Sequence, residues 1–268
     1  FLSVPEARDV TGMYGFYKEK ENSMDVIFIG PSTIYTGFYS PLAYAEEGFT
    51  SYAVSTGGLS GAMYRYAVNE ARQSQSPDLY VVDISGFCDE DQRDSAAMRR
   101  FADSIKKGSN RDAFIAEMVP EEEQESYRIP FLKYHSGWER VRGCFKTMVD
   151  KIAMDRKGYS VTKNFCAYAD TVQDEEKRGT YELSEEGMES LKEFLTFLKN
   201  EEIANVLFLR CPNRDFVEKG NTLKTAEVMI AEAGFDYLDT VEATEPALFG
   251  ISASKDFTDQ KIVLQPTN

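Results

Sequence analysis

Short apolar runs alternate along the chain with helix-patterned segments, and this alternation strongly limits the folds open to it. Residues 25–30 read DVIFIG, residues 79–84 LYVVDI and residues 205–210 NVLFLR, without polar alternation. Runs of this kind are typical of parallel strands covered on both faces. A weaker strand is predicted at residues 50–55, TSYAVS.

Helical periodicity fills the segments between and after these runs. Apolar residues recur at three- and four-residue spacing from Leu59 to Ala71, from Met188 to Leu198 and from Leu223 to Ala233. Lys199 suits the last turn of the second segment, and Gly234 is a stop signal for the third. Strands and helices in this order predict an α/β fold with a doubly wound, mainly parallel sheet.

The middle of the chain, about residues 88–180, has a different character. It is charged, leans toward helix and is broken by VPEEEQESYRIP. We interpret it as a helical insertion or cap over the sheet, and we expect one domain over residues 25–268.

Charge and composition restrict the function classes. The chain has 45 acidic and 30 basic residues, a formal net charge of −15, which disfavours nucleic-acid binding. No apolar run reaches the roughly 18 to 20 residues of a membrane helix. The four cysteines, without a Cys-x-x-Cys pair, predict no zinc or redox motif, and both free thiols and two disulfides remain open. We expect no cofactor and no metal.

The first strand presents a serine at its carboxyl end. In MDVIFIGPSTIYTGF, Gly30 permits a sharp turn, and Pro31 leaves the backbone N–H of Ser32 available as an oxyanion donor. Ligands bind at the carboxyl ends of strands in open α/β sheets, so Ser32 suits a nucleophile. The alternative is a helix cap by Ser32 or Thr33.

A glycine-rich turn follows the second strand. VSTGGLSG, residues 54–61, does not have the spacing of a G-x-G-x-x-G dinucleotide site. The N–H of Gly57 or Gly58 suits an oxyanion hole, and a tight turn that needs positive φ is the alternative.

These blocks carry a family resemblance that runs from about residue 25 to 264. DVIFIGPSTIYTGF, the stretch from YAVSTGGLSG to LYVVDIS, YHSGW at residues 134–138 and KDFTDQKIVL at residues 255–264 resemble the successive blocks of the SGNH/GDSL hydrolase superfamily. More narrowly, they are similar to exported SGNH-like proteins of Gram-positive bacteria, distant relatives of alginate O-acetyltransferases and of the protein that transfers D-alanine to teichoic acids. The resemblance implies a three-layer SGNH/flavodoxin-like fold.

The family's site residues transfer onto this chain only in part. Ser32 occupies the nucleophile position, and Gly57 or Gly58 the oxyanion glycine. The asparagine of the third block has no counterpart, since Asp83 and Ile84 end that strand. The last block should read Asp-x-x-His, but Asp259 is followed three residues later by Ile262.

The missing histidine bears directly on catalysis. A serine hydroxyl needs a base, and removing the histidine of such a constellation lowers turnover on the order of 10⁶-fold. The only histidine is His135, which either substitutes as the base or packs beside Trp138. Asp256 and Asp259 either orient a base, or accept the proton weakly, or are solvated loop residues.

Three functions remain open. The first is an acyl-ester hydrolase or O-acyltransferase acting on a cell-envelope carbohydrate or another acylated small molecule. The second is an inactive SGNH-fold module that binds or assembles cell-surface glycan. The third, dinucleotide or phosphate binding, rests on generic α/β topology. The resemblance also implies an extracellular or cell-surface protein with an N-terminal membrane tether, in which residues 1–24 form a membrane-proximal stalk.

Overall fold

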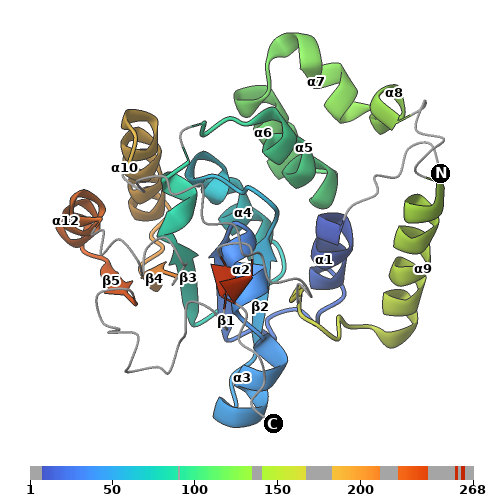
Figure 1. The fold of residues 1–268 in the computed structure, drawn as a ribbon, viewed down its shortest axis with the longest axis horizontal. Coiled ribbons are helices and arrows are strands. Elements are labelled where there is room, and N and C mark those ends of the chain that lie inside the picture. Colours follow the sequence, from blue (N-terminus) through green and yellow to red (C-terminus); the bar gives the residue numbers. More distant parts are fainter. Residues whose placement is uncertain are drawn as a thin grey trace.

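The computed structural model contains a five-stranded sheet in which every pair of neighbouring strands runs parallel (Figure 1). It describes residues 8–89, 91–134, 141–166, 183–211, 223–240, 257–258 and 261–262. The strand order β2-β1-β3-β4-β5 is that of flavodoxin-like doubly wound folds. The predicted α/β class and parallel sheet are therefore confirmed.

The elements follow the predicted alternation closely. The sheet consists of β1 (Val26–Gly30), β2 (Ser51–Ser55), β3 (Leu79–Asp83), β4 (Val206–Arg210) and β5 (Asp236–Asp239). The helices are α1 (Arg8–Phe16), α2 (Ser32–Gly37), α3 (Ser40–Glu47), α4 (Tyr64–Arg72), α5 (Ser95–Ser104), α6 (Ser109–Met118), α7 (Glu121–Arg128), α8 (Pro130–Tyr134), α9 (Val141–Lys157), α10 (Glu185–Asn200) and α12 (Lys224–Ala233). Two 3-10 turns, η1 (Gly61–Met63) and η2 (Ile84–Phe87), and a separate antiparallel pair, β6 (Phe257–Thr258) and β7 (Lys261–Ile262), complete the described elements.

The two faces of the sheet carry hydrophobic clusters of very different size. Side chains alternate along β1, so Ile27 and Ile29 lie in the large cluster and Phe28 lies on the opposite face. Helices α1, α4, α10 and α12 all contribute to the large cluster. The buried members of the small cluster are Phe28, Ile34, Tyr35, Ala53 and Val81. Among the described helices, α2 is the one that contributes buried side chains to this second face.

Two helix ends agree with the signals read from the sequence. Lys199 lies in the last turn of α10, whose other end is capped by the Ser184 hydroxyl, which accepts the N–H of Gly187 at 3.0 Å. Gly234 ends α12 in the left-handed conformation, with φ of +88°.

The described part of the middle of the chain is mostly helical, as predicted. Helices α5, α6 and α7 add Phe101, Phe114 and Tyr127 to the large cluster, and α5 also packs against α1. These helices thus share the core of the sheet. That residues 88–180 are an insertion into a family fold stays a prediction.

Helix α1 lies N-terminal to the boundary that we expected at residue 24. Its Met13 and Phe16 are fully buried in the large cluster, and the helix packs against β2, α5 and α9. The described part of the expected stalk therefore contacts the α/β unit. The membrane-proximal role of residues 1–24 stays a prediction, and none of the described helices is both long and apolar enough to cross a membrane.

Strand β2 lies at one edge of the sheet, and a later segment covers its outer side. The side-chain amide of Asn164 donates to the carbonyls of Ala53 at 2.8 Å and Ser55 at 3.0 Å. The N–H of Ala53 donates to the carbonyl of Lys163 at 3.4 Å. These bonds satisfy edge groups that would otherwise be open to another strand.

Candidate active site

The point where the chain leaves β1 and β3 in opposite directions defines the candidate site. After β1, Ile34 and Tyr35 of α2 belong to the small cluster, whereas after β3, Ile84 and Phe87 belong to the large cluster on the other face. Because β1 and β3 are neighbours, the chain leaves two adjacent strand ends toward opposite faces of the sheet, which makes this edge the switch point of the fold. Crevices at such switch points are where doubly wound sheets bind ligands.

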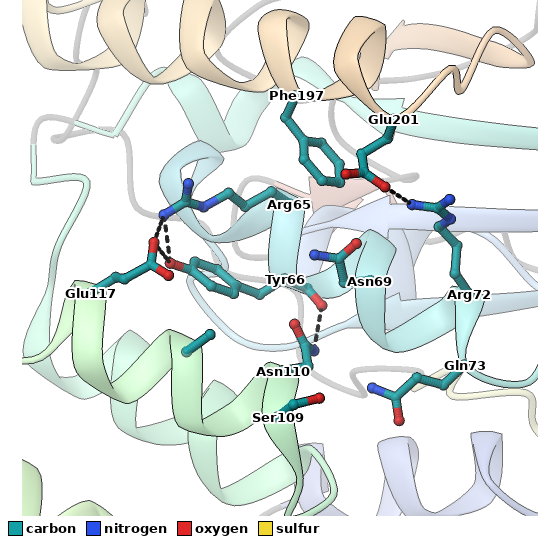
Figure 2. A pocket seen from close by; sticks show the side chains of 11 residues that line it. Arg65, Tyr66, Asn69, Arg72, Gln73, Ser109, Asn110, Glu117, Phe197 and Glu201 are labelled. Atoms are coloured by element: carbon teal, nitrogen blue, oxygen red, sulfur yellow. Dashed lines mark hydrogen bonds and ion pairs between the residues drawn. The ribbon is translucent and has the colours of Figure 1, made fainter.

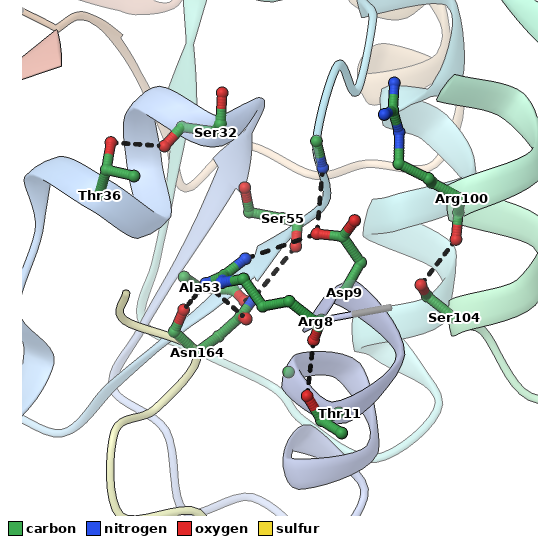
Figure 3. A network of polar contacts seen from close by, with 12 residues as sticks. Arg8, Asp9, Thr11, Ser32, Thr36, Ala53, Ser55, Arg100, Ser104 and Asn164 are labelled. Carbon is green, nitrogen blue, oxygen red and sulfur yellow. Dashed lines mark hydrogen bonds and ion pairs between the residues drawn. The ribbon is translucent and has the colours of Figure 1, made fainter. Parts of the chain in front are cut away.

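Ser32 and Thr33 lie at this switch point, in the first turn after β1. Ser32 is the first residue of α2, and its carbonyl accepts the Thr36 hydroxyl at 2.7 Å (Figure 3). Thr33 donates its hydroxyl to the Asp83 carboxylate at the end of β3. The two strand ends are thereby joined directly beside Ser32.

Asp83 is the buried centre of this arrangement. Its carboxylate also accepts the Ser85 hydroxyl at 2.7 Å and the Ser85 N–H at 3.1 Å, and the side chain is completely buried. Burial raises the pKa of Asp83, while the bonds from Thr33, Ser85 and the Cys211 backbone oppose that rise. Three strand ends, those of β1, β3 and β4, therefore meet at one carboxyl group.

Gly30 allows β1 to approach Asp83 this closely. A β-carbon at Gly30 would lie 2.7 Å from Cβ of Asp83 and 2.7 Å from Cγ1 of Ile34. Real side chains do not tolerate such contacts, so the glycine is required by packing at this turn. The glycine that was predicted to permit a turn also makes room for the buried carboxyl.

The nearby thiols are not activated. Burial, followed by the charge of Asp83, raises the pKa of Cys88 to about 12 and holds the pKa of Cys211 well above its ordinary value. A thiolate is the reactive form of cysteine, so neither side chain is a nucleophile at neutral pH. All four cysteines are free. Cys166 packs on the same small cluster as Cys211, and its N–H donates to the Tyr35 carbonyl of α2 at 2.9 Å, whereas Cys144 is buried in α9.

The predicted oxyanion glycines lie at the carboxyl end of β2, and the backbone N–H of one of them already makes a hydrogen bond. The N–H of Gly57 donates to the Asp9 carboxylate of α1 at 3.2 Å. Gly58 has φ of +71°, which confirms that the turn needs positive φ. Among the described residues, no hydrogen-bond acceptor binds the Gly58 N–H.

Cationic side chains flank the Asp9 carboxylate. Arg8 lies 3.4 Å from it, and Figure 3 shows both residues between Asn164 and Arg100. Burial raises the pKa of Asp9, and Arg8, the Gly57 N–H and Arg100 oppose the rise. The Arg8 guanidinium also stacks 3.4 Å above the Tyr35 ring, which connects α1 to α2.

The remaining predicted site residues lie outside the described residues: His135, Asp256 and Asp259. The structure does place β7, which ends at Ile262, against α2, the helix that begins at Ser32. Among the described residues, no group of His, Cys, Asp and Glu is arranged to hold a metal ion.

Two functional candidates were missed from the sequence. Asp83 could have been found, because it ends an apolar strand at the same sheet edge as Ser32. Asp9 could not, because only the packing of α1 brings it to Gly57.

A groove of about 700 Å³ lies between α4, α6 and α10 (Figure 2). Its charged side chains are paired across the groove: Arg65 binds Glu117 at 2.5 Å and Arg72 binds Glu201 at 2.8 Å. These pairs leave little charge to select a ligand. The groove also lies on the α4 side of the sheet, whereas Ser32 begins the helix on the other side.

Comparison with known proteins does not assign the chain to a family. No protein-family model, no curated protein and no solved structure matches the chain. The class that fold and site define is a doubly wound α/β protein with a serine, a threonine and a buried aspartate at its switch point.

Proposed function

We propose that the protein is an SGNH hydrolase-like protein of the acyl-ester hydrolase or O-acyltransferase type, with Ser32 as its nucleophile. The observation that carries the proposal is the position of Ser32, which follows β1 at the switch point of a 2-1-3-4-5 sheet. Thr33 and Asp83 fix the backbone on either side of that position. The substrate is an acylated cell-envelope carbohydrate.

The chemistry is acyl transfer through a covalent intermediate. The Ser32 oxygen bonds to the acyl carbon while the hydroxyl proton passes to His135 or Asp259. The oxyanion of the resulting tetrahedral intermediate accepts a hydrogen bond from the Ser32 N–H. Because Asp9 occupies the Gly57 N–H, the second donor is the N–H of Gly58. The ester C–O bond then breaks, the departing alcohol takes the proton, and water or an acceptor hydroxyl releases the acyl group.

A second candidate function is binding without turnover, and two observations favour it. The Asp9 carboxylate lies on the Gly57 N–H, and an anion there repels the negative charge of a tetrahedral intermediate. Ile262 stands where the family has its histidine. In this case the switch point recognises a surface glycan and leaves it unchanged.

Labelling with a fluorophosphonate, read by intact mass, tests the first function without knowledge of the substrate. We expect a one-to-one adduct on the wild-type chain that Ser32→Ala removes and that Ser109→Ala, which alters an exposed serine of α6 on the α4 side of the sheet, retains. No adduct, beside a labelled active relative, would mean that the Ser32 hydroxyl is not activated. The binding function then takes its place, and the assay becomes glycan affinity.

The proposal extends to location. An extracellular or cell-surface protein held by an N-terminal membrane tether agrees with a substrate in the envelope. Fractionation of cells that express the full-length protein tests this, and recovery in the soluble cytosolic fraction would overturn it.

A further inference from the structure

Helix α9 lies at the edge of the molecule, and one of its faces packs on α1 (Figure 1). On that side Cys144 and Thr147 are buried. Asp155 binds Lys18 at 2.6 Å and accepts the Tyr14 hydroxyl at 2.8 Å. The inner face of α9 is thus fully used in holding α1.

The outer face of α9 carries an exposed apolar stripe. Phe145, Val149 and Ile152 are 57%, 46% and 48% exposed, and their spacing of four and three residues places them on one side of the helix. Ala153 is exposed beside them. An exposed apolar stripe on a helix is a sign of an interaction surface.

Basic side chains share this face. Arg142, Lys146, Arg156 and Lys157 are exposed, and none of the four forms an ion pair with any described residue. At 3.6 residues per turn, these four and the apolar stripe fall within an arc of roughly 140°. The full helix has five basic and two acidic residues, and one of the two acids, Asp155, is bound to Lys18.

We propose that the outer face of α9 is a docking surface for an anionic lipid bilayer. Val149, Ile152 and Phe145 enter the boundary between head groups and acyl chains, while the four basic side chains contact lipid phosphates. Amphipathic helices with basic flanks bind interfaces in this manner. At 17 residues α9 lies in the interface plane and does not span it.

The formal net charge of −15 does not oppose this contact. The screening length at physiological ionic strength is about 8 Å, so charges on the far side of the molecule contribute little at the bilayer. The anionic lipid repels the acidic rest of the protein surface, and this repulsion orients the molecule so that α9 faces the bilayer.

The same charges argue against a second copy of the chain as the partner. A two-fold interface would bring the α9 face of one copy against the same face of the other. Four unpaired basic residues from each copy would then meet, which disfavours the contact.

This inference goes beyond the proposed function and does not depend on Ser32 or on a tether. Flotation of the 268-residue chain with vesicles of phosphatidylcholine, alone or mixed equally with phosphatidylglycerol, tests it. We expect binding to the mixed vesicles only, weakened when salt rises from about 0.1 M to about 1 M and the screening length falls to about 3 Å. Equal binding to both kinds of vesicle, or to neither, would overturn it.

Variants locate the surface. Val149→Glu and Ile152→Glu are expected to abolish flotation, and Lys146→Gln, Arg156→Gln and Lys157→Gln to weaken partitioning about fivefold for each charge removed. The matched control is Val228→Glu on α12, which replaces a valine that is 53% exposed and should bind as the wild type does. Because the altered side chains are exposed, unchanged thermal unfolding is expected for all variants.

Two results would contradict the assignment. The first is flotation of Ile152→Glu equal to that of the wild type. The second is sedimentation showing a wild-type dimer that Ile152→Glu converts to monomer, since the surface would then be an interface between copies.

Discussion

At the scale of single residues, the proposed function makes the carboxyl group of Asp83 a positioning group for Ser32. It receives hydrogen bonds from Thr33 and Ser85 and lies against Gly30, so the chain on both sides of Ser32 is tied to one buried point. A nucleophile needs this kind of fixed support, because small displacements of reacting groups lower the rate strongly.

Asp89 gives a pH-dependent prediction at the same edge. Desolvation of its carboxyl and the charges of Asp83, Asp94 and Asp91 raise its pKa from 3.8 to about 6. A raised pKa means that the folded chain holds the proton more tightly than the unfolded chain. This contribution to stability is therefore present below about pH 4 and lost as the pH rises through about 6.

Urea unfolding from pH 4 to 7 checks this, together with the carboxyl carbon titration of Asp89 by NMR. Asp89→Asn should remove the decline, which will be shallow because the residue is exposed to solvent. Asp25→Asn is a control that should leave the pH 4 to 7 slope unchanged, because bonds from Thr50 lower the pKa of Asp25 and its contribution to stability declines only below about pH 4. An Asp89 carboxyl that titrates near pH 4 would contradict the prediction.

At the scale of elements, Glu70 joins three helices through one buried carboxylate. It accepts the Tyr17 hydroxyl at 2.5 Å, the Gln73 amide at 3.0 Å and the Asn110 amide at 2.7 Å. Glu70 is 1% exposed, so water cannot replace these donors. The carboxylate holds α4, α6 and the end of α1 in register.

Glu70→Ala should therefore lower the free energy of unfolding by on the order of 3 kcal/mol or more, because buried donors lose their acceptor. Chemical denaturation measures the loss. Glu117→Ala, which removes an exposed pair with Arg65, is the matched control and should cost less than about 1 kcal/mol. Equal losses in both variants would show that the Glu70 network is not structural.

Local pattern explains which elements were predictable. Strand β1 is an uninterrupted apolar run and was found, whereas β5 has four residues with aspartate at both ends and was not. Helix α1 contains two glycines, which weaken any helix signal. They are required by contacts: β-carbons at Gly12 and Gly15 would lie 1.8 Å from Asn164 Oδ1 and 2.6 Å from the Tyr52 hydroxyl.

The candidate site divides in the same way. Ser32 and Gly57 come two residues after a strand and Asp83 is the last residue of one, so the sequence and the parallel-sheet rule are enough to bring them to one edge. Asp9 comes from a helix 48 residues before Gly57 and reaches it only through tertiary packing. No spacing rule predicts a contact of that kind.

At the scale of the whole molecule, α1 completes the fold. It covers β2 with Met13 and Phe16, holds α9 through Tyr14, and binds the segment after α9 through Arg8. Its removal would expose the large cluster and leave the inner face of α9 without a partner.

We therefore compare a chain that starts at Lys18 with a chain that starts at Arg8. The shorter chain is expected either to lose cooperative thermal unfolding or to unfold at a clearly lower temperature. Circular dichroism during heating and limited proteolysis measure this. Equal unfolding temperatures would mean that α1 is dispensable, and would favour a stalk over residues 1–24.

Lys163 and Asn164, which cover the edge of β2, are synthesised well after β2 itself. Asn164 reaches back 111 residues to Ala53. At about 5 to 20 residues per second, a ribosome makes β2 some 5 to 20 s before its cover. During this interval a nascent chain presents an open strand edge to neighbouring chains on the same message, so a holding chaperone would act first on the amino-terminal third of the protein.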